Sequence, residues 1–111
     1  MPKNINIDGS EIKDWSSFHD YFSKTFGFPD FYGRNMNAWI DCMTSLDAPD
    51  ECMCSVHVPV GDVMVFCISG VKDLKRRCPD IYDAIVECSA FVNLRRIDMG
   101  QSAVIALSFF G

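Results

Sequence analysis

The sequence has few groups that could do chemistry or bind nucleic acid. Only 2 of the 111 residues are histidine, and no grouping of His, Cys, Ser and carboxylates has catalytic spacing. A glycine-rich phosphate loop is also missing. Basic residues are scarce, with 10 Lys and Arg against 15 Asp and Glu and a net charge of −5. Nucleic-acid binding depends on cations that neutralise phosphates. We therefore expect no enzyme activity, no catalytic residue and no direct contact with nucleic acid.

Long apolar runs are absent as well. No stretch is long enough and apolar enough to cross a membrane. The chain runs from Met1 straight into a short strand-like pattern, without the apolar core of a secretory leader. Six cysteines in such a chain are best explained as reduced thiols rather than a disulfide framework. We expect a cytoplasmic protein that does not contact a membrane.

A metal site is also not expected. Cys52, Cys54 and His57 are the three candidate ligands in one loop, and no second cysteine pair follows at zinc-finger spacing. The remaining cysteines fall mostly on apolar stripes, where a small core residue is the ordinary interpretation. We expect no metal and no cofactor.

The apolar content supports one folded domain over residues 1–111. Nearly half of the residues are hydrophobic, and nine are phenylalanine. The patterns predict strands at 4–7, 63–68 and 103–107, and helices that end at Gly27 and span 36–46, 71–77 and 79–96. The strand at 63–68 is apolar throughout, which is typical of a strand covered on both faces. The expected fold is α/β, a small three-stranded parallel sheet packed with helices.

Several finer features are predicted from spacing and capping. Ser17 is a plausible N-cap of the first helix, and Asn35 of the second. The inner stripes of the first and last helices are expected to be Trp15, Phe18, Phe22 and Phe26, and Ile81, Ala84, Ile85, Cys88, Phe91 and Val92. Residues 47–61 are expected to form a mobile loop, with a short extended piece at 56–58.

Charge is unevenly distributed along the chain. Residues 1–70 carry ten acids against four bases, whereas residues 71–111 carry five acids against six bases. An acidic surface attracts a basic partner and speeds encounter. The basic residues at 72–77 are expected to form a solvated helix face. The run from Asn93 to Arg96 is expected to satisfy carbonyl groups near a helix C-terminus.

The stretch "FPDFYGRNMNAWIDCM", residues 28–43, combines aromatic residues with a helix start. Helical spacing places Asn37, Asp41 and Thr44 opposite an apolar stripe, and Phe31 and Tyr32 just before the helix. Two interpretations are open from the residues alone. The aromatic residues could fold back onto the core beside ordinary solvated polar groups. Alternatively, they could form the rim of a docking surface around a central acid.

A resemblance favours the second interpretation. Ten residues at fixed spacing resemble the helix-two signature of the barstar family of ribonuclease inhibitors: Pro29, Phe31, Tyr32, Gly33, Asn35, Asn37, Ala38, Asp41, Cys42 and Thr44. The turn at Ile7-Asp8-Gly9, His19 and the last strand are similar too. The resemblance implies a barstar-like fold and an inhibitor of the immunity or antitoxin type. Such a protein would occlude a basic, toxin-like ribonuclease with its second helix and the preceding loop.

The resemblance also implies roles for individual residues. Asp41 would enter the nuclease active site, and Phe31 and Gly33 would belong to the loop that covers it. The full expected partner-binding set is Phe31, Tyr32, Gly33, Asn35, Asn37, Ile40, Asp41 and Thr44. The chain departs from the family at Asn37, where the family has a second acid, and at Ile40, where it has a tryptophan. These departures support an alternative, a barstar-like interaction module for a deoxyribonuclease or a regulatory protein.

Overall fold

The computed structural model describes residues 3–111. The expectation that no leader precedes the first strand concerns Met1 and Pro2, which lie outside the described residues. The strands of the structure are β1 (Lys3–Asp8), β2 (Met64–Ser69) and β3 (Ile105–Phe109). Its helices are α1 (Trp15–Phe26), α2 (Met36–Thr44), α3 (Val71–Arg77) and α4 (Pro79–Asp98), with short 3-10 turns at Gly9–Glu11 and Pro49–Glu51. The predicted α/β fold with a three-stranded parallel sheet is confirmed.

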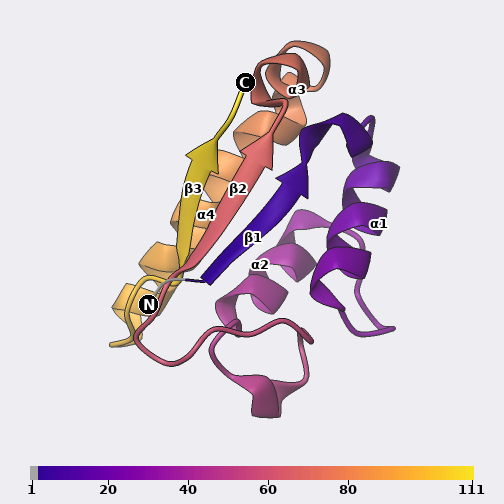
Figure 1. The fold of residues 1–111 in the computed structure, drawn as a ribbon. Coiled ribbons are helices and arrows are strands. Elements are labelled where there is room, and N and C mark those ends of the chain that lie inside the picture. Colours follow the sequence, from indigo (N-terminus) through magenta and orange to yellow (C-terminus); the bar gives the residue numbers. More distant parts are fainter. Residues whose placement is uncertain (1–2) are drawn as a thin grey trace.

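The strands are ordered β1-β2-β3, and both pairs are parallel. Phe66 on the central strand faces Ile5 on one side and Leu107 on the other. Parallel neighbours need long crossover connections. The segment with α1 and α2 provides the first crossover, and α3 and α4 provide the second (Figure 1).

The helices lie on one side of the sheet, and no helix of the described chain covers the other side (Figure 1). Met64, Phe66 and Ile68 are buried against the helices, whereas Val65 and Cys67 on the opposite face are only half-buried. The expectation that strand 63–68 is covered on both faces was therefore wrong. An apolar run is compatible with a strand that has helices on both faces. It is equally compatible with a central strand that has a neighbouring strand on each side and helices on one face, as β2 has.

The core is rich in aromatic side chains. Phe18, Phe22 and Phe26 of α1 are fully buried, as their spacing predicts. Trp39 of α2 packs edge-on against Phe22, with ring centroids 5.7 Å apart, and Phe66 of β2 contacts Phe22 and Phe26. Edge-to-face packing suits the charge distribution of aromatic rings. Trp39 is fully buried, on the side of α2 opposite the exposed Asn37 and Asp41.

Two residues assigned to inner stripes are exposed instead. Trp15 is 39% exposed because it is the first residue of α1, where its ring stacks on His19 rather than entering the core. Phe91 is 52% exposed on α4, which was also not expected. Periodicity alone assigns a face to each residue but does not show how far the covering elements reach.

The observed ends of α1 and α2 can be compared with the ends that the sequence predicts. The N-cap of α1 is Asp14, not Ser17, because the Asp14 carboxylate accepts from the Ser17 N–H and the Ser17 hydroxyl accepts from the Asp14 N–H. Gly27 ends α1 in a left-handed conformation, as predicted. Asn35 caps α2, also as predicted, but α2 ends at Thr44, two residues before the expected end.

Within residues 47–61, the short extended piece expected at 56–58 does not form a strand. The segment is nevertheless attached to the core. Cys54 and Val58 are buried, the Val58 N–H donates to the Leu46 carbonyl, and the Ser55 N–H donates to the Phe26 carbonyl. The backbone of the segment therefore bonds near the C-terminal ends of α1 and α2, and the His57 carbonyl accepts from the Lys3 side chain of β1. Its expected mobility remains a prediction.

Candidate protein-docking site

The loop that precedes α2 places its two central aromatic side chains in opposite environments. The Tyr32 ring is half-buried and packs on Phe28, and its hydroxyl oxygen lies 2.6 Å from Nδ1 of His19. Phe31, its neighbour, is 75% exposed. Tyr32 therefore folds back onto the core, as the first interpretation has it, whereas Phe31 projects into solvent, as the second requires.

Arg34 and Asn35 hold this loop in place. Arg34 adopts a left-handed backbone conformation with φ of 54°, which is uncommon for a residue with a side chain. Its guanidinium pairs with Asp20 of α1 at 2.7 Å and donates to the Ser16 carbonyl. The Asn35 side chain accepts from the Ala38 N–H and donates to the Gly33 carbonyl. Such bonds order the loop before any partner binds, which lowers the entropic cost of association.

The contact between His19 and Tyr32 is a neutral hydrogen bond. Burial, and then the positive charge of Arg34, lower the pKa of His19 below its ordinary value. Burial raises the pKa of the Tyr32 hydroxyl, so neither group is charged near neutral pH. Trp15 stacks on the His19 ring, with centroids 5.9 Å apart. His19 therefore joins α1 to the loop.

The outer face of α2 carries the central acid of the candidate site. Asn37 and Asp41 are both exposed, as their spacing predicts. Ile40 is half-buried, and the half-buried Thr44 uses its hydroxyl to donate to the Ile40 carbonyl at 2.6 Å. The groups exposed toward a partner are the Phe31 ring, the Asn37 amide and the Asp41 carboxylate, together with the Gly33 backbone, whose carbonyl already accepts from Asn35.

Asp41 also makes a contact that the sequence did not indicate. Its Oδ1 accepts from Nη1 of Arg95 on α4 at 2.8 Å, across 54 positions of sequence. The pair is partly solvated, with exposed side-chain fractions of 57% for Asp41 and 42% for Arg95. No local pattern could reveal it, because the pairing depends on how α2 and α4 pack.

Two hollows meet at Asp41. The first, of about 350 Å³, gathers six of the eight predicted residues: Phe31, Tyr32, Gly33, Asn35, Asn37 and Asp41. The second, of about 520 Å³, contains Thr44 with Arg95 and Arg96. Asp41 and Met53 line both. The predicted site is therefore largely contiguous, and Met53 and Arg95 are members that sequence reasoning missed.

The thiols beneath the site are unreactive. Burial raises the pKa of Cys42 to about 11 and that of Cys54 to about 12, so both thiols are protonated at neutral pH. The Cys54 thiol donates to the Cys42 carbonyl. Among residues 3–111, no group of His, Cys, Asp and Glu is arranged to hold a metal ion. The site thus offers contact surface and charge rather than nucleophiles.

A buried arginine fixes α4 against the end of α2. Arg96 is 2% exposed and donates to both carboxylate oxygens of Asp47, at 2.9 and 2.6 Å, and to the carbonyls of Thr44 and Ser102. Asn93, one turn earlier, bonds the backbone of Ile105 at the start of β3. The Asn93–Arg96 run therefore satisfies carbonyls as expected, but those of other segments rather than of its own helix.

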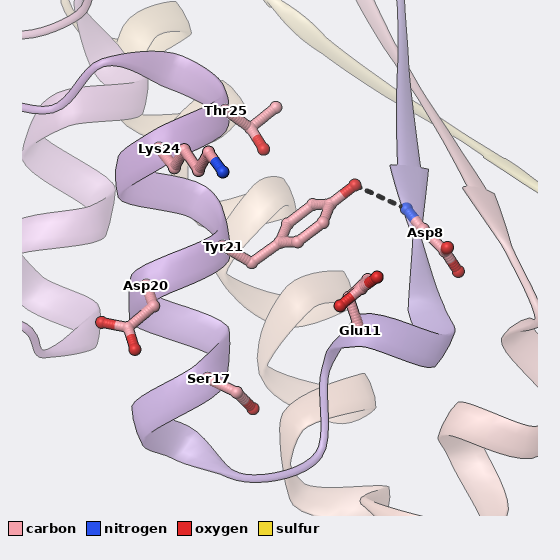
Figure 2. Close-up of a pocket in the computed structure, with 7 residues that line it drawn as sticks. All are labelled: Asp8, Glu11, Ser17, Asp20, Tyr21, Lys24 and Thr25. Atoms are coloured by element: carbon pink, nitrogen blue, oxygen red, sulfur yellow. Dashed lines mark hydrogen bonds between the residues drawn. The ribbon is translucent and has the colours of Figure 1, made fainter.

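A larger hollow, of about 710 Å³, lies elsewhere, between α1 and the end of β1 (Figure 2). It is lined by Asp8, Glu11, Asp20 and Lys24, and it contains none of the predicted docking residues. In Figure 2 the Tyr21 hydroxyl reaches the edge of β1, where it accepts from the Asp8 N–H at 2.7 Å. This contact attaches α1 to an edge strand, and the role is structural.

Fold and site together define a small α/β protein with an ordered aromatic loop and an exposed acid on the helix that follows it. Residues 3–99 match the family described as Barstar (barnase inhibitor), and the chain belongs to the barstar family. A curated relative, "Putative ribonuclease inhibitor YrdF" of Bacillus subtilis (strain 168), is 40% identical over 48 residues. That match covers 42% of this chain and 53% of the relative, so the chain spans about half the length of the curated relative it matches.

No helix among residues 3–111 is long and apolar enough to span a membrane.

Proposed function

We propose that this protein inhibits a ribonuclease by covering its active site with the loop 28–34 and α2. The observation that carries the proposal is that Phe31 and Asp41 are both exposed and line the same hollow of about 350 Å³. The loop beside this hollow is already ordered by contacts of Arg34 and Tyr32. Membership of the barstar family, whose description reads barnase inhibitor, supports the same role, and so does the name of the curated relative.

The mechanism requires contact but no chemistry. A ribonuclease must present cations where it holds RNA phosphates. The Asp41 carboxylate would occupy such a position, and Phe31 would cover apolar surface beside it. Tyr32, Asn35 and Thr44 would act by holding the loop and helix in shape, because their polar groups are already bonded within the chain. Such an inhibitor needs no cofactor.

The biological setting proposed is that of an immunity protein or antitoxin. An inhibitor of this type meets its toxin-like ribonuclease in the cytoplasm, before the enzyme can damage the cell that makes it. The acidic chain, with a net charge of −5, would be attracted to a basic enzyme.

A second candidate function is docking to a different protein, either a deoxyribonuclease or a regulator. Asn37 and the Asp41–Arg95 pair favour it, since they make the face less acidic than one with two free carboxylates. Ile40 favours it as well, because an aliphatic side chain in place of a tryptophan changes the shape of the face. Binding would use the same loop and helix, so the surface does not distinguish the two functions.

Capture from the cells that carry the gene, followed by cleavage assays, tests the proposal. Tagged protein is purified with its partner, the partner is released, and its cleavage of RNA and of DNA is measured with and without added inhibitor. We expect RNA cleavage that the wild type suppresses and that Asp41→Ala does not. Asp83→Ala is the matched control, because Asp83 is an exposed helical acid on α4. DNA cleavage would support the alternative, and no suppressed activity would refute nuclease inhibition.

A further inference from the structure

The ion pair formed by Asp41 and Arg95 leaves hydrogen-bonding capacity unused on both side chains. One hydrogen bond of 2.8 Å joins Oδ1 of Asp41 to Nη1 of Arg95, and both side chains remain partly exposed. A carboxylate can accept more than one bond, and a guanidinium carries five N–H donors in a planar fork. Both partners can therefore bind further charged groups, and each is close enough to influence what the other binds.

Arg95 differs in this respect from Arg96 in the same hollow. Arg96 is 2% exposed, and its bonds to Asp47, Thr44 and Ser102 occupy its guanidinium. Arg95 lies at the surface, 42% exposed, and Asp41 is its hydrogen-bond partner. Of the two arginines that line this hollow, Arg95 is the one that an approaching protein would meet.

The charge next to Asp41 is more balanced than that of the whole chain. The chain carries a net charge of −5, but the neutral Asn37 lies one turn from Asp41 on α2 and the cationic Arg95 is in direct contact. The hollow beside this pair also contains Asp47, which is paired with Arg96, and Glu51. A cationic active site that approaches Asp41 must share the carboxylate with Arg95 and must also approach the guanidinium. Like charges brought together at an interface lower affinity.

We propose that Arg95 is a specificity-determining residue of the docking face. It acts as an internal counter-ion that competes with a partner's cation for Asp41, and it thereby weakens binding to ribonucleases with a uniformly cationic active site. This inference rests on the proposed function, because it assumes that α2 faces a ribonuclease. It adds that the face selects among ribonucleases by charge.

Barnase, the enzyme in the family's description, is the probe for this inference. Its affinity is measured by titration for the wild type, Arg95→Ala and Arg95→Glu. We expect Arg95→Ala to bind about two- to fivefold tighter, the range for removing a solvated ion pair. Arg95→Glu should bind about tenfold tighter or more, since it also replaces repulsion with attraction. Thermal melts establish that the variants remain folded.

Arg76→Glu is the matched control for net charge. It makes the same charge change at an exposed position on α3, where Arg76 pairs with Asp73. A gain equal to that of Arg95→Glu would mean that long-range attraction accounts for the effect, and the inference would be overturned. An Arg95→Glu variant that binds barnase no tighter than the wild type, including one with no measurable binding, would also overturn it.

Combining the changes separates competition from simple repulsion. If Arg95 competes for Asp41, Arg95→Ala should give a smaller gain in the Asp41→Ala background than in the wild type. An equal gain in both backgrounds would refute competition.

The proposed function is judged separately, on the ribonuclease captured from the cell. If that enzyme is inhibited while Arg95→Glu gains nothing on barnase, only the inference about Arg95 fails. If no ribonuclease is captured, the proposed function fails, and the barnase titration still reports whether Arg95 opposes binding.

Discussion

Replacing Asp47 with alanine should strongly destabilise the protein, because it leaves a charged guanidinium buried without its partner. Arg96 is 2% exposed, and two of its bonds go to the Asp47 carboxylate, whose side chain is 10% exposed. Removing one member of a buried ion pair costs about 3–5 kcal/mol. That is a large fraction of the 5–15 kcal/mol that is typical for a domain.

Chemical denaturation of wild type and variant measures the loss directly. In a thermal melt the same loss should lower Tm by about 12 °C or more, since roughly 4 °C accompanies each kcal/mol in a domain near this size. Asp50→Ala is the control, because Asp50 is an exposed acid three residues away, and its loss should change stability by about 0.5 kcal/mol or less. A cost below about 1 kcal/mol for Asp47→Ala would refute the reasoning.

A double variant distinguishes a stranded charge from lost packing. Asp47→Leu combined with Arg96→Met removes both charges and keeps apolar volume in place. Replacing both members of a buried pair with apolar residues is often neutral or stabilising. We therefore expect the double variant to be more stable than Asp47→Ala. If the two are equally unstable, the carbonyl bonds from Arg96 to Thr44 and Ser102 carry the stability instead.

Four further outcomes are expected. Asp41→Ala should lower binding to the captured ribonuclease by about 2–5 kcal/mol, with little change in Tm because its ion pair is solvated; wild-type binding should weaken as salt is added. Asn37→Asp should leave the melt unchanged and strengthen binding only if the partner has a spare cation, as titration would show. Burial holds the pKa of His19 below its ordinary value of 6.5. The contribution of the neutral imidazole to the free energy of unfolding is therefore complete above about pH 6.5 and is lost as the pH falls below it. Denaturation at several pH values should show this loss in the wild type and not in His19→Gln. Gly27→Ala should destabilise the protein by about 1 kcal/mol or more in denaturation, since φ is +66° and a Cβ would meet the Ser55 side chain.

The architecture was accessible from sequence because its determinants are local. Alternation and apolar runs marked all three strands, and the spacing of Phe18, Phe22 and Phe26 marked the buried face of α1. The cap at Asn35 was visible because a side chain that caps a helix lies next to the residues it caps. The cap at Asp14 was missed because Ser17, its partner in the capping box, is itself a common N-cap residue.

The features that the sequence did not reveal depend on contacts between distant segments. Val65 and Cys67 are as apolar as residues under a helix, and only the placement of the helices leaves them half-buried. The role of Arg96 likewise required Asp47, 49 positions away. Periodicity describes one element at a time, so it cannot show which element covers another or which charges meet.

The candidate site combines both kinds of determinant, and this limits what family membership implies for the partner. The loop and α2 are local, so the barstar signature locates Phe31, Asn37 and Asp41 correctly on one surface. The charge that a partner meets at Asp41 is not set locally, because the guanidinium of Arg95 on α4 pairs with the Asp41 carboxylate. Two members of one family can therefore share the signature, fold alike and present Asp41 in the same place, and still bind different enzymes. For this chain we expect the choice of partner to depend on the α4 residue opposite Asp41, so substitutions at Arg95 should change that choice while the fold and the position of the site stay the same.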